Sequence, residues 1–306
     1  MDIKEYQIRA TNTDQNPQLF QPPQLGQPAT PQKNELIPLL GLVGEVGGLL
    51  SEYKKMLRDG AVHEQFNELV EEELGDILWY IATVATKFGL DLDKIAQNNL
   101  IKTEDRWHPP NGQRTLYDVT LNENQQLPRT FSYKFTHQSI DGADKLVLID
   151  CTNGQQAGDP LTDNSYEDDG YRYHDVMHLA FVAHFGWSPV FRKLLRKLGS
   201  IQKRPQETDE GEDSGRPQVI DEAIVAAIYV YADNHKFLKG VDAVDWQLLR
   251  HIKQMTAKLE VKDRTTGEWN SAILNGVKVW KQLIDNNGGI VTGNLETGQL
   301  TFTKLT

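Results

Sequence analysis

Carboxylates in two helical stretches are the residues whose types and spacing most clearly suit chemistry. The first stretch, 41–47, carries Glu45, and the second, 71–80, carries Glu73 and Asp76. Glu73 and Asp76 share one helical face, because positions three apart are neighbours on a helix surface. Two such helices packed antiparallel would gather these acids, whose charges repel unless a divalent cation lies among them. The pattern therefore indicates a metal, and hard oxygen ligands favour Mg²⁺, with Mn²⁺ as the alternative.

Short motifs follow one another in a fixed order along residues 1–108. They are Glu5-Tyr6-Gln7, 41–47, Lys54-Lys55, 72–80, 89–92, 99–102 and Arg106-Trp107. This series, which covers about a third of the chain, resembles the MazG-like, all-α nucleoside triphosphate pyrophosphohydrolases. The resemblance implies Mg²⁺-dependent hydrolysis of an NTP or dNTP to the monophosphate and pyrophosphate, with the ion held by Glu45, Glu73 and Asp76.

The first acidic motif departs from the pattern of that family. The family has ExxE on one helix and ExxD on the next, whereas here Glu45 is followed three residues later by Gly48. Glu52 lies seven residues after Glu45, on the same helical face but one turn beyond Gly48. Three interpretations stay open: Glu52 is a displaced ligand, a water fills the gap, or the site binds nucleotide without hydrolysing it.

Other roles in such a site follow from the resemblance. The candidates for the catalytic base are Glu72 and Glu52, and the sequence does not choose between them. The candidates for contact with the substrate are Lys54, Lys55, Asn99, Lys102 and Arg106. For each of these the alternative is a solvated side chain or one that pairs with a helix dipole.

A second cluster lies near the middle of the chain. His174 and His178 are four residues apart, so they share a helical face and can chelate a metal, with a third ligand from Asp221-Glu222 of a later helix, for which Glu222 is taken. The alternative is a pair of histidines in an ordinary polar network. These histidines make a metallohydrolase centred on them one rival function. The other rival is a nucleotide-binding or sensing module with a weakened catalytic site, which Gly48 keeps open.

Composition narrows the classes of protein. The 306-residue chain has a net charge of −11, which opposes binding to long nucleic acid because Lys and Arg supply most of that affinity. Its one cysteine, Cys151, cannot form an internal disulfide, which suits a reducing compartment. The longest apolar runs are shorter than the roughly 20 residues that span a bilayer. We therefore expect a cytoplasmic protein without membrane contact.

Periodicity predicts a mainly α protein with a small β element. Helices are expected at 2–12, 34–58, 61–88, 91–106, 171–186, 189–198, 218–235, 243–259 and 267–286. Strands are expected at 115–120, 130–137, 145–150, 290–293 and 299–304. We expect the last two strands to form a hairpin that joins the central strands in one sheet.

Three segments follow from this order of elements. They are an N-terminal MazG-like helical bundle (1–110), a β-containing connector (111–165) and a C-terminal helical domain with a terminal hairpin (166–306). Residues 199–217 are too polar to be expected to pack, although their acids can pair with the basic stretch 192–197. A homo-oligomer is expected because one helical unit buries its apolar faces poorly, and a monomer covered by its own second domain is the alternative.

Overall fold

The structure is a computed structural model that describes residues 1–15, 18–21, 33–107 and 116–305, without the side chains of 33–35, 106 and 107. The chain divides into two compact units, Met1–Thr103 and Glu104–Thr306.

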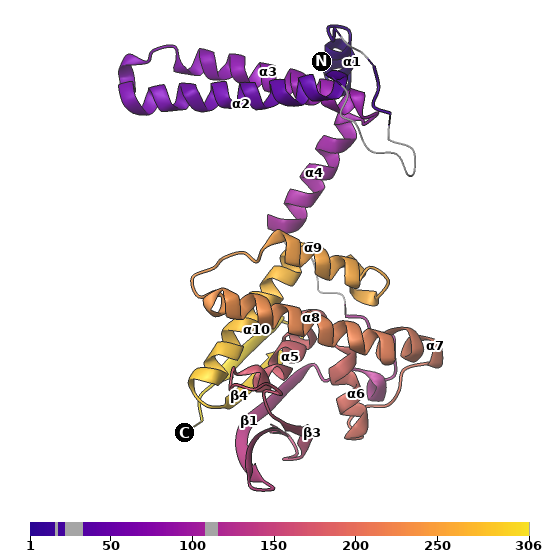
Figure 1. The fold of residues 1–306 in the computed structure, drawn as a ribbon. Helices are drawn as coiled ribbons and strands as arrows, with labels where there is room; N and C mark the ends of the chain where they lie inside the picture. The colour runs from indigo at the N-terminus through magenta and orange to yellow at the C-terminus, as the bar shows by residue number, and fades with distance from the viewer. Residues whose placement is uncertain (16–17, 22–32, 108–115, 306) are drawn as a thin grey trace. The chain divides into compact units, whose positions relative to one another are not determined.

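The N-terminal unit is built on a helical hairpin (Figure 1). Its elements are α1 (Ile3–Thr11), α2 (Lys33–Asp59), the short η1 (Gly60–Val62), α3 (Phe66–Lys87) and the start of α4 (Leu92–Trp107). Helices α2 and α3 run antiparallel along each other, and α1 packs against α3. A small cluster of Ala10, Ala82, Ala85 and Leu92 forms the buried core. The unit thus buries few apolar side chains of its own.

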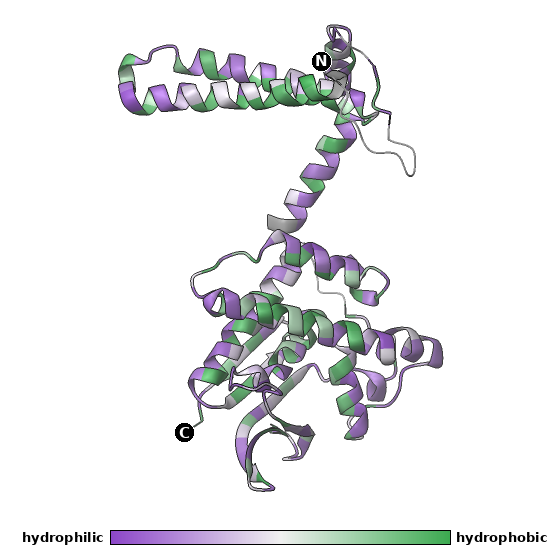
Figure 2. Cartoon of the chain, in the orientation of Figure 1, coloured by the Kyte–Doolittle hydropathy of each residue, from purple (hydrophilic) through white to green (hydrophobic). Residues whose placement is uncertain are grey.

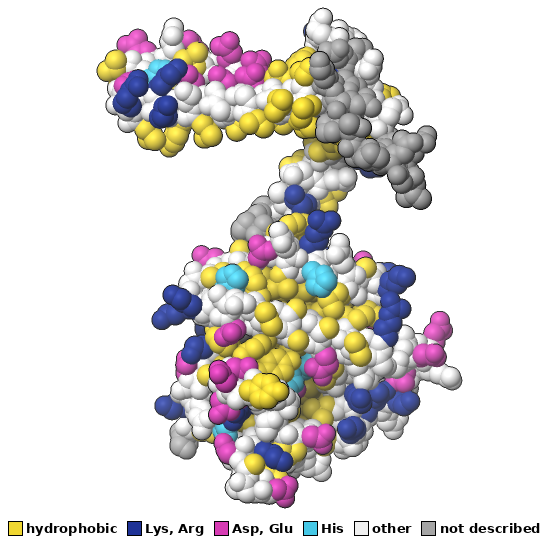
Figure 3. Space-filling model, in the orientation of Figure 1, with side chains coloured by type: hydrophobic (Ala, Val, Ile, Leu, Met, Phe, Trp, Pro, Cys, Tyr) yellow, Lys and Arg dark blue, Asp and Glu magenta, His cyan; other side chains and the backbone are white. Residues whose placement is uncertain are grey.

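The hairpin has an apolar side that the unit does not cover. Figure 3 shows hydrophobic side chains gathered along α2 and acidic ones along α3. By length and composition alone, the stretch Leu36–Val62 is apolar enough to cross a membrane, and 11% of its most apolar window is buried. A helix whose apolar face meets another protein passes the same test, so this is weak evidence for a membrane span.

The C-terminal unit contains an antiparallel five-stranded sheet of order β3-β2-β1-β4-β5. The strands are β1 (Thr130–Ile140), β2 (Ala143–Asp150), β3 (Gln156–Leu161), β4 (Gly289–Asn294) and β5 (Gln299–Thr303). The terminal hairpin joins the central strands through β1 and β4, where Tyr133 faces Val291. This pairing ties residues more than 150 positions apart into one sheet.

Helices cover the sheet and complete one core. They are α5 (Asp175–Phe185), α6 (Pro189–Lys197), α7 (Gln206–Thr208), α8 (Gly215–Asn234), α9 (Trp246–Met255) and α10 (Thr266–Asp285), with short turns η2 to η6 at 123–125, 171–173, 209–213, 236–238 and 260–263. Helix α5 packs on β4 and β5, α10 packs on α5, and α8 contacts α5 and α6. The predominance of hydrophobic colour on the inner helices in Figure 2 matches this core.

Helix α5 is buried on every side. From Val176 to Phe185, only His184 is not fully buried. Gly276 lets α10 approach α5, because a Cβ there would lie 2.6 Å from the sulfur of Met177. Gly186, with a φ of 66°, ends the helix in the left-handed region that glycine adopts without strain.

The predicted mainly α class with a C-terminal β element is confirmed. The helix expected at 189–198 is α6, which Ser188 caps, since its Oγ accepts a hydrogen bond from the amide of Phe191 at 3.1 Å. The strand expected at 115–120 is wrong for 116–120, which form turns, and residue 115 lies outside the described residues. Strand β3 was not predicted, because its Asp, Pro and Gly residues obscure the alternation.

The expectation that residues 199–217 are too polar to pack is wrong. Arg204 and Asp213 are buried, and the Arg204 guanidinium binds both Asp213 oxygens, at 2.8 and 2.6 Å. Arg204 also donates to Glu260 at 2.9 Å. The predicted pairing of this segment with the basic helix is confirmed, because Arg196 binds Asp209. Charge pairing therefore holds the segment together with the apolar contact of Ile201, which is buried in the core.

Glu212 gives a pH-dependent test of this packing. Burial, together with the nearby Glu260 carboxylate, raises the pKa of Glu212 from 4.5 to about 7. Because the folded-state pKa lies above the unfolded one, the stability that Glu212 contributes is full below about pH 4.5 and is lost as the pH rises through about 7. We expect Glu212→Gln to raise the free energy of unfolding by about 1–2 kcal/mol at pH 8, after allowance for solvent screening, and little at pH 5.

Urea unfolding at the two pH values measures this difference, with the exposed Glu210→Gln as the matched control. An equal effect of Glu212→Gln at both pH values would contradict the assignment.

Candidate functional site

The carboxylates of the N-terminal unit face one another across the hairpin. Glu45 lies on α2, and Glu73 and Asp76 lie on α3. The Glu73 carboxylate rests directly on α2 at Gly48, because a Cβ added there would lie 2.2 Å from Glu73 Oε2. The glycine that breaks the family pattern therefore makes room for the acid of the other helix.

Glu73 is in an environment that disfavours its charge. Desolvation raises its pKa, and the negative charges of Glu45, Glu52, Asp76 and Glu72 raise it further. Its Oε2 atom is buried and has no hydrogen-bond partner among the described groups. A carboxylate oxygen that is both buried and unpaired is costly, and a bound cation would remove this cost.

Glu52 is already engaged by cationic groups. It is buried, accepts a hydrogen bond from Lys55 at 2.5 Å and lies 3.1 Å from His63 Nε2. The hydrogen bond from Lys55 is the largest cause of its lowered pKa. Glu52 is therefore held as an ion-pair partner at the end of the hairpin rather than as a free base.

The other predicted residues of this site are less constrained. Glu72 and Asp76 are exposed on α3, Lys54 is exposed on α2, and Asn99 and Lys102 are exposed on α4. The side chain of Arg106 lies outside the described part of the chain. The structure thus places Glu73 against Gly48, with Glu45 close enough to raise its pKa.

The histidines of the C-terminal unit form a tighter group. Among the described residues, one set of three metal-ligating side chains has its ligand atoms within 4.8 Å of one another: His174, His178 and Glu222. The carboxylate oxygens of Glu45, Glu73 and Asp76 do not all lie this close together. His174 precedes α5, His178 lies inside it, and Glu222 comes from α8.

Asp221 orients His178. The two residues are fully buried, and His178 Nδ1 lies 2.9 Å from Asp221 Oδ1. The second oxygen of Asp221 accepts from Ser188 Oγ at 2.6 Å and from the Val190 amide at 3.2 Å. Burial lowers the pKa of His178, but the carboxylates of Asp221 and Glu222 outweigh it and raise that pKa to about 10. The site therefore strongly favours a positive charge at this imidazole.

Glu222 lies on the outer side of the cluster. Its side chain is 48% exposed, and its pKa is lowered chiefly by the interaction with His178. It borders a groove of about 640 Å³ whose lining also includes Tyr171, Lys193 and Val219. The ligand atoms of the cluster are thus next to a space that a small molecule can enter.

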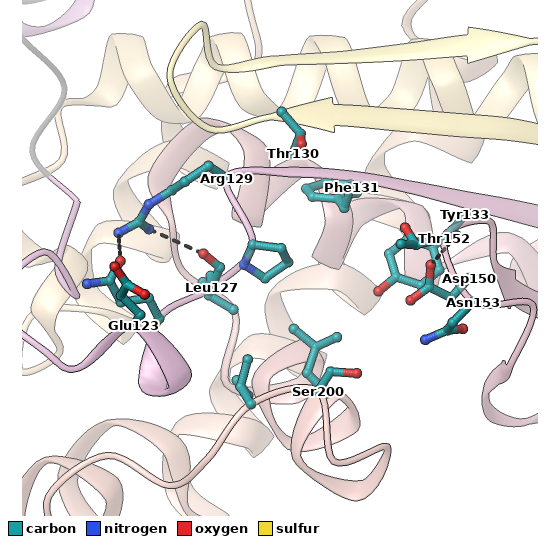
Figure 4. A pocket seen from close by; sticks show the side chains of 14 residues that line it. Glu123, Leu127, Arg129, Thr130, Phe131, Tyr133, Asp150, Thr152, Asn153 and Ser200 are labelled. Atoms are coloured by element: carbon teal, nitrogen blue, oxygen red, sulfur yellow. Dashed lines mark hydrogen bonds between the residues drawn. The ribbon is translucent and has the colours of Figure 1, made fainter.

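A second cavity, of about 490 Å³, lies beside the start of β1 (Figure 4). Two of its charged side chains have partners: Arg129 binds Asp118 at 2.8 Å and Gln126 at 2.6 Å, and Asp150 accepts from the Thr152 amide at 2.8 Å. The third charged residue of the lining, Glu123, is exposed, so the cavity offers space beside a solvated carboxylate.

Sequence reasoning named Asp221 only as a possible source of a third ligand and missed two further contributors to the histidine cluster. Asp221 instead orients His178, Tyr171 stacks on His174 with ring centroids 4.7 Å apart, and Lys193 lines the groove. One signal was present, since an acid between Ile220 and Ile224 in an apolar helix requires a buried partner. Nothing in the sequence pattern indicates the contacts of Tyr171 or Lys193.

Comparison with known proteins places the chain in a family. Residues 112–306, more than half of the chain, match the family described as the MazG C-terminal domain. The chain therefore belongs to this family. The match confirms a relation to MazG proteins, but it lies in the C-terminal part rather than in the residues 1–108 that carry the predicted motifs. A family of the nucleotide pyrophosphatase type is consistent with a hydrolase.

One curated relative is the Gene 37 protein of Mycobacterium phage L5. It is 38% identical over 69 residues, which are 22% of this chain. The chain spans 60% of the length of that relative. No solved structure matches the chain.

Proposed function

We propose that the chain is a Mg²⁺-dependent nucleoside triphosphate pyrophosphohydrolase whose metal is held by Glu45, Glu73 and Asp76. The observation that carries this proposal is the state of Glu73. Its carboxylate is packed onto Gly48, partly desolvated and close to four other acids, with one oxygen buried and unpaired. The donor set consists of carboxylate oxygens, which suits Mg²⁺.

Bound Mg²⁺ would neutralise phosphate charge and lower the pKa of the attacking water. The water oxygen bonds to the α phosphorus, the α–β phosphoanhydride bond breaks, and pyrophosphate leaves. A base has to take the proton of that water. We propose Glu72 for this role over Glu52, because Glu52 is engaged by Lys55 and His63.

We propose Lys54, Asn99, Lys102 and Arg106 as contacts to the triphosphate or sugar, with Lys55 divided between this role and its ion pair with Glu52. The proposed ligand is a free nucleotide, because the net charge of −11 disfavours a long nucleic acid whereas a triphosphate needs only local cations.

The proposal is tested by pyrophosphate release from each NTP and dNTP with Mg²⁺. We expect Glu73→Gln combined with Asp76→Asn to lower kcat/KM by at least about 100-fold, because the metal contributes several kcal/mol to the transition state. Glu71→Gln, exposed on α3 and two positions from Glu73, is the matched control. Absence of release from any nucleotide would falsify hydrolysis. Mg²⁺-dependent nucleotide binding without release would instead support the nucleotide-binding module.

Gly48 provides a second test. We expect Gly48→Ala to lower turnover by about 100-fold, because the added Cβ displaces the Glu73 carboxylate and a shift of about 1 Å in a catalytic group has an effect of this size. The same change removes a helix-interior glycine, so the free energy of unfolding should not fall as the activity does.

Gly75→Ala is the matched control, since a Cβ there meets nothing within 4 Å. Kinetics and thermal unfolding are measured on both variants. Unchanged activity in Gly48→Ala, or a large gain in Gly48→Glu, would show that the present arrangement is not the working one.

We further propose that a second copy of this chain covers the apolar side of α2. Val43, Leu50 and Leu57 are spaced by seven residues and therefore share one side of the helix. Their exposed fractions are 69%, 62% and 71%. Glu45 lies about 200° around the helix from Val43, so pairing along this stripe leaves the acidic side open to substrate.

Light scattering coupled to size exclusion tests this pairing. We expect the wild-type chain to have at least twice the monomer mass and Leu50→Lys with Leu57→Lys to shift it towards the monomer, because buried Lys charges oppose association. Val230→Lys, at a position exposed on α8, is the control. A monomeric wild-type chain at micromolar concentration would contradict the proposal.

A further inference from the structure

One nitrogen of the buried His178 imidazole is hydrogen-bonded to Asp221, and the other has no hydrogen bond. Asp221 is fully buried and offers only acceptor oxygens to Ser188, Val190 and His178, so His178 Nδ1 carries the proton of their 2.9 Å hydrogen bond. His178 Nε2 is buried and has no hydrogen-bond partner among the described groups. Its distance of 3.5 Å from Glu222 Oε2 is too long for a good hydrogen bond. This nitrogen therefore points at Glu222 with its bonding capacity unused.

His174 is oriented in the same way by a different partner. Its Nδ1 lies 3.0 Å from the carbonyl oxygen of Tyr171, which can only accept, so Nδ1 carries the proton. The ring is stacked on the Tyr171 ring at an interplanar angle of 10°, which limits its rotation. With Nδ1 engaged by that carbonyl, Nε2 is the nitrogen left to bind a metal; it lies 3.6 Å from Asp175 Oδ1, and the cluster brings a ring nitrogen of His174 within 4.8 Å of the ligand atoms of His178 and Glu222.

We propose that His174 Nε2, His178 Nε2 and the Glu222 carboxylate bind one divalent transition-metal ion, of which Zn²⁺ is the type. The three ligand atoms lie within 4.8 Å of one another. Two atoms bound tetrahedrally to the same Zn²⁺ are about 3.4 Å apart, given bonds of about 2.0–2.2 Å. The His178–Glu222 pair is already at this separation, and His174 has to close by a small rotation.

The groups that accept hydrogen bonds from these two histidines are of the kind found behind the histidine ligands of metal sites. A ligating histidine usually donates its other N–H to a carboxylate or a backbone carbonyl, which fixes the ring and makes it a stronger ligand. Here Asp221 serves His178, and the Tyr171 carbonyl serves His174. The charges also balance, because the carboxylates of Asp221 and Glu222 together offset the two positive charges of the ion.

The chemical types and the number of the ligands indicate which metal ion the site prefers and whether the ion can bind a further ligand. Two imidazoles and one carboxylate favour Zn²⁺ and its neighbours over Mg²⁺, which prefers oxygen ligands. Three protein ligands leave a coordination position open, as in catalytic rather than structural zinc sites. This position borders the groove lined by Lys193 and Val219, so the site would take a small ligand whose anionic oxygen reaches the metal.

The competing account is a metal-free ion pair, in which an imidazolium of His178 serves Asp221 and Glu222. Both accounts use the same hydrogen bonds to Asp221, but they differ in Zn²⁺ uptake. The experiment uses the full chain carrying Glu73→Gln and Asp76→Asn, so that the acids of the N-terminal unit do not contribute metal. After chelation and dialysis, the bound Zn²⁺ is counted by elemental analysis, and affinity is measured by titration against a chelating dye.

We expect one Zn²⁺ per chain, and Co²⁺ in its place to give the visible absorption bands of a low-symmetry site. His174→Gln and Glu222→Gln are each expected to weaken Zn²⁺ binding by more than about 100-fold, since even outer-shell changes weaken such sites 10- to 100-fold. The matched controls are His235→Gln, and Asp233→Asn on the same helix as Glu222, both at exposed positions. They are expected to change the affinity by less than about twofold.

Glu222 is half exposed, so its variant is expected to fold, and thermal unfolding supplies the check. Saturating Zn²⁺ should raise the Tm of the parent chain and leave that of Glu222→Gln unchanged, because only a ligand bound by the native state stabilises it. The inference is overturned if the parent chain takes up no Zn²⁺, or if His174→Gln and Glu222→Gln bind Zn²⁺ as the controls do.

Discussion

The buried carboxylate of Asp221 is the interaction on which the C-terminal unit most depends. It belongs to α8, receives the imidazole N–H of α5, and receives the hydroxyl and an amide at the start of α6. The same Ser188 hydroxyl caps α6. A charge this deep in a protein is tolerated only when its acceptor sites are filled, so three helices have to meet at this point. The orientation of His178 follows from that requirement.

The two units present different chemistry for cations. On the hairpin, acids approach one another with few cationic partners, and glycine on the opposite helix allows close packing of Glu73. In the C-terminal unit, the two imidazoles are each oriented by a hydrogen bond within the protein, His174 by the Tyr171 carbonyl and His178 by Asp221. The first arrangement suits a hard, exchangeable ion that accompanies a phosphate, and the second suits a softer ion that stays with the protein.

Helices were predictable from the sequence, because their formation depends mainly on the pattern of neighbouring residues. Helical periodicity predicted the long helices and the start of α6 at residue 189. Contacts between distant segments were not predictable in this way. The burial of Arg204 depends on Asp213 and on Glu260. The ion pair of Glu52 depends on His63, which lies in a turn, and the periodicity of the sequence does not predict the path of that turn. Polar composition predicted a solvated segment at 199–217, because composition does not show which charges find partners.

In the candidate sites, too, local spacing was predictable from the sequence and contacts between distant segments were not. The spacing of His174 and His178 showed that they share a face, and this needs only the pitch of a helix. Which nitrogen of each ring is available depends on acceptors from elsewhere in the fold, so it became visible only with the structure. Since α5 is enclosed on all sides, the imidazole of His178 cannot follow a ligand outwards. Any adjustment during binding or release at the proposed site would therefore come from His174, which precedes α5, and from the half-exposed Glu222.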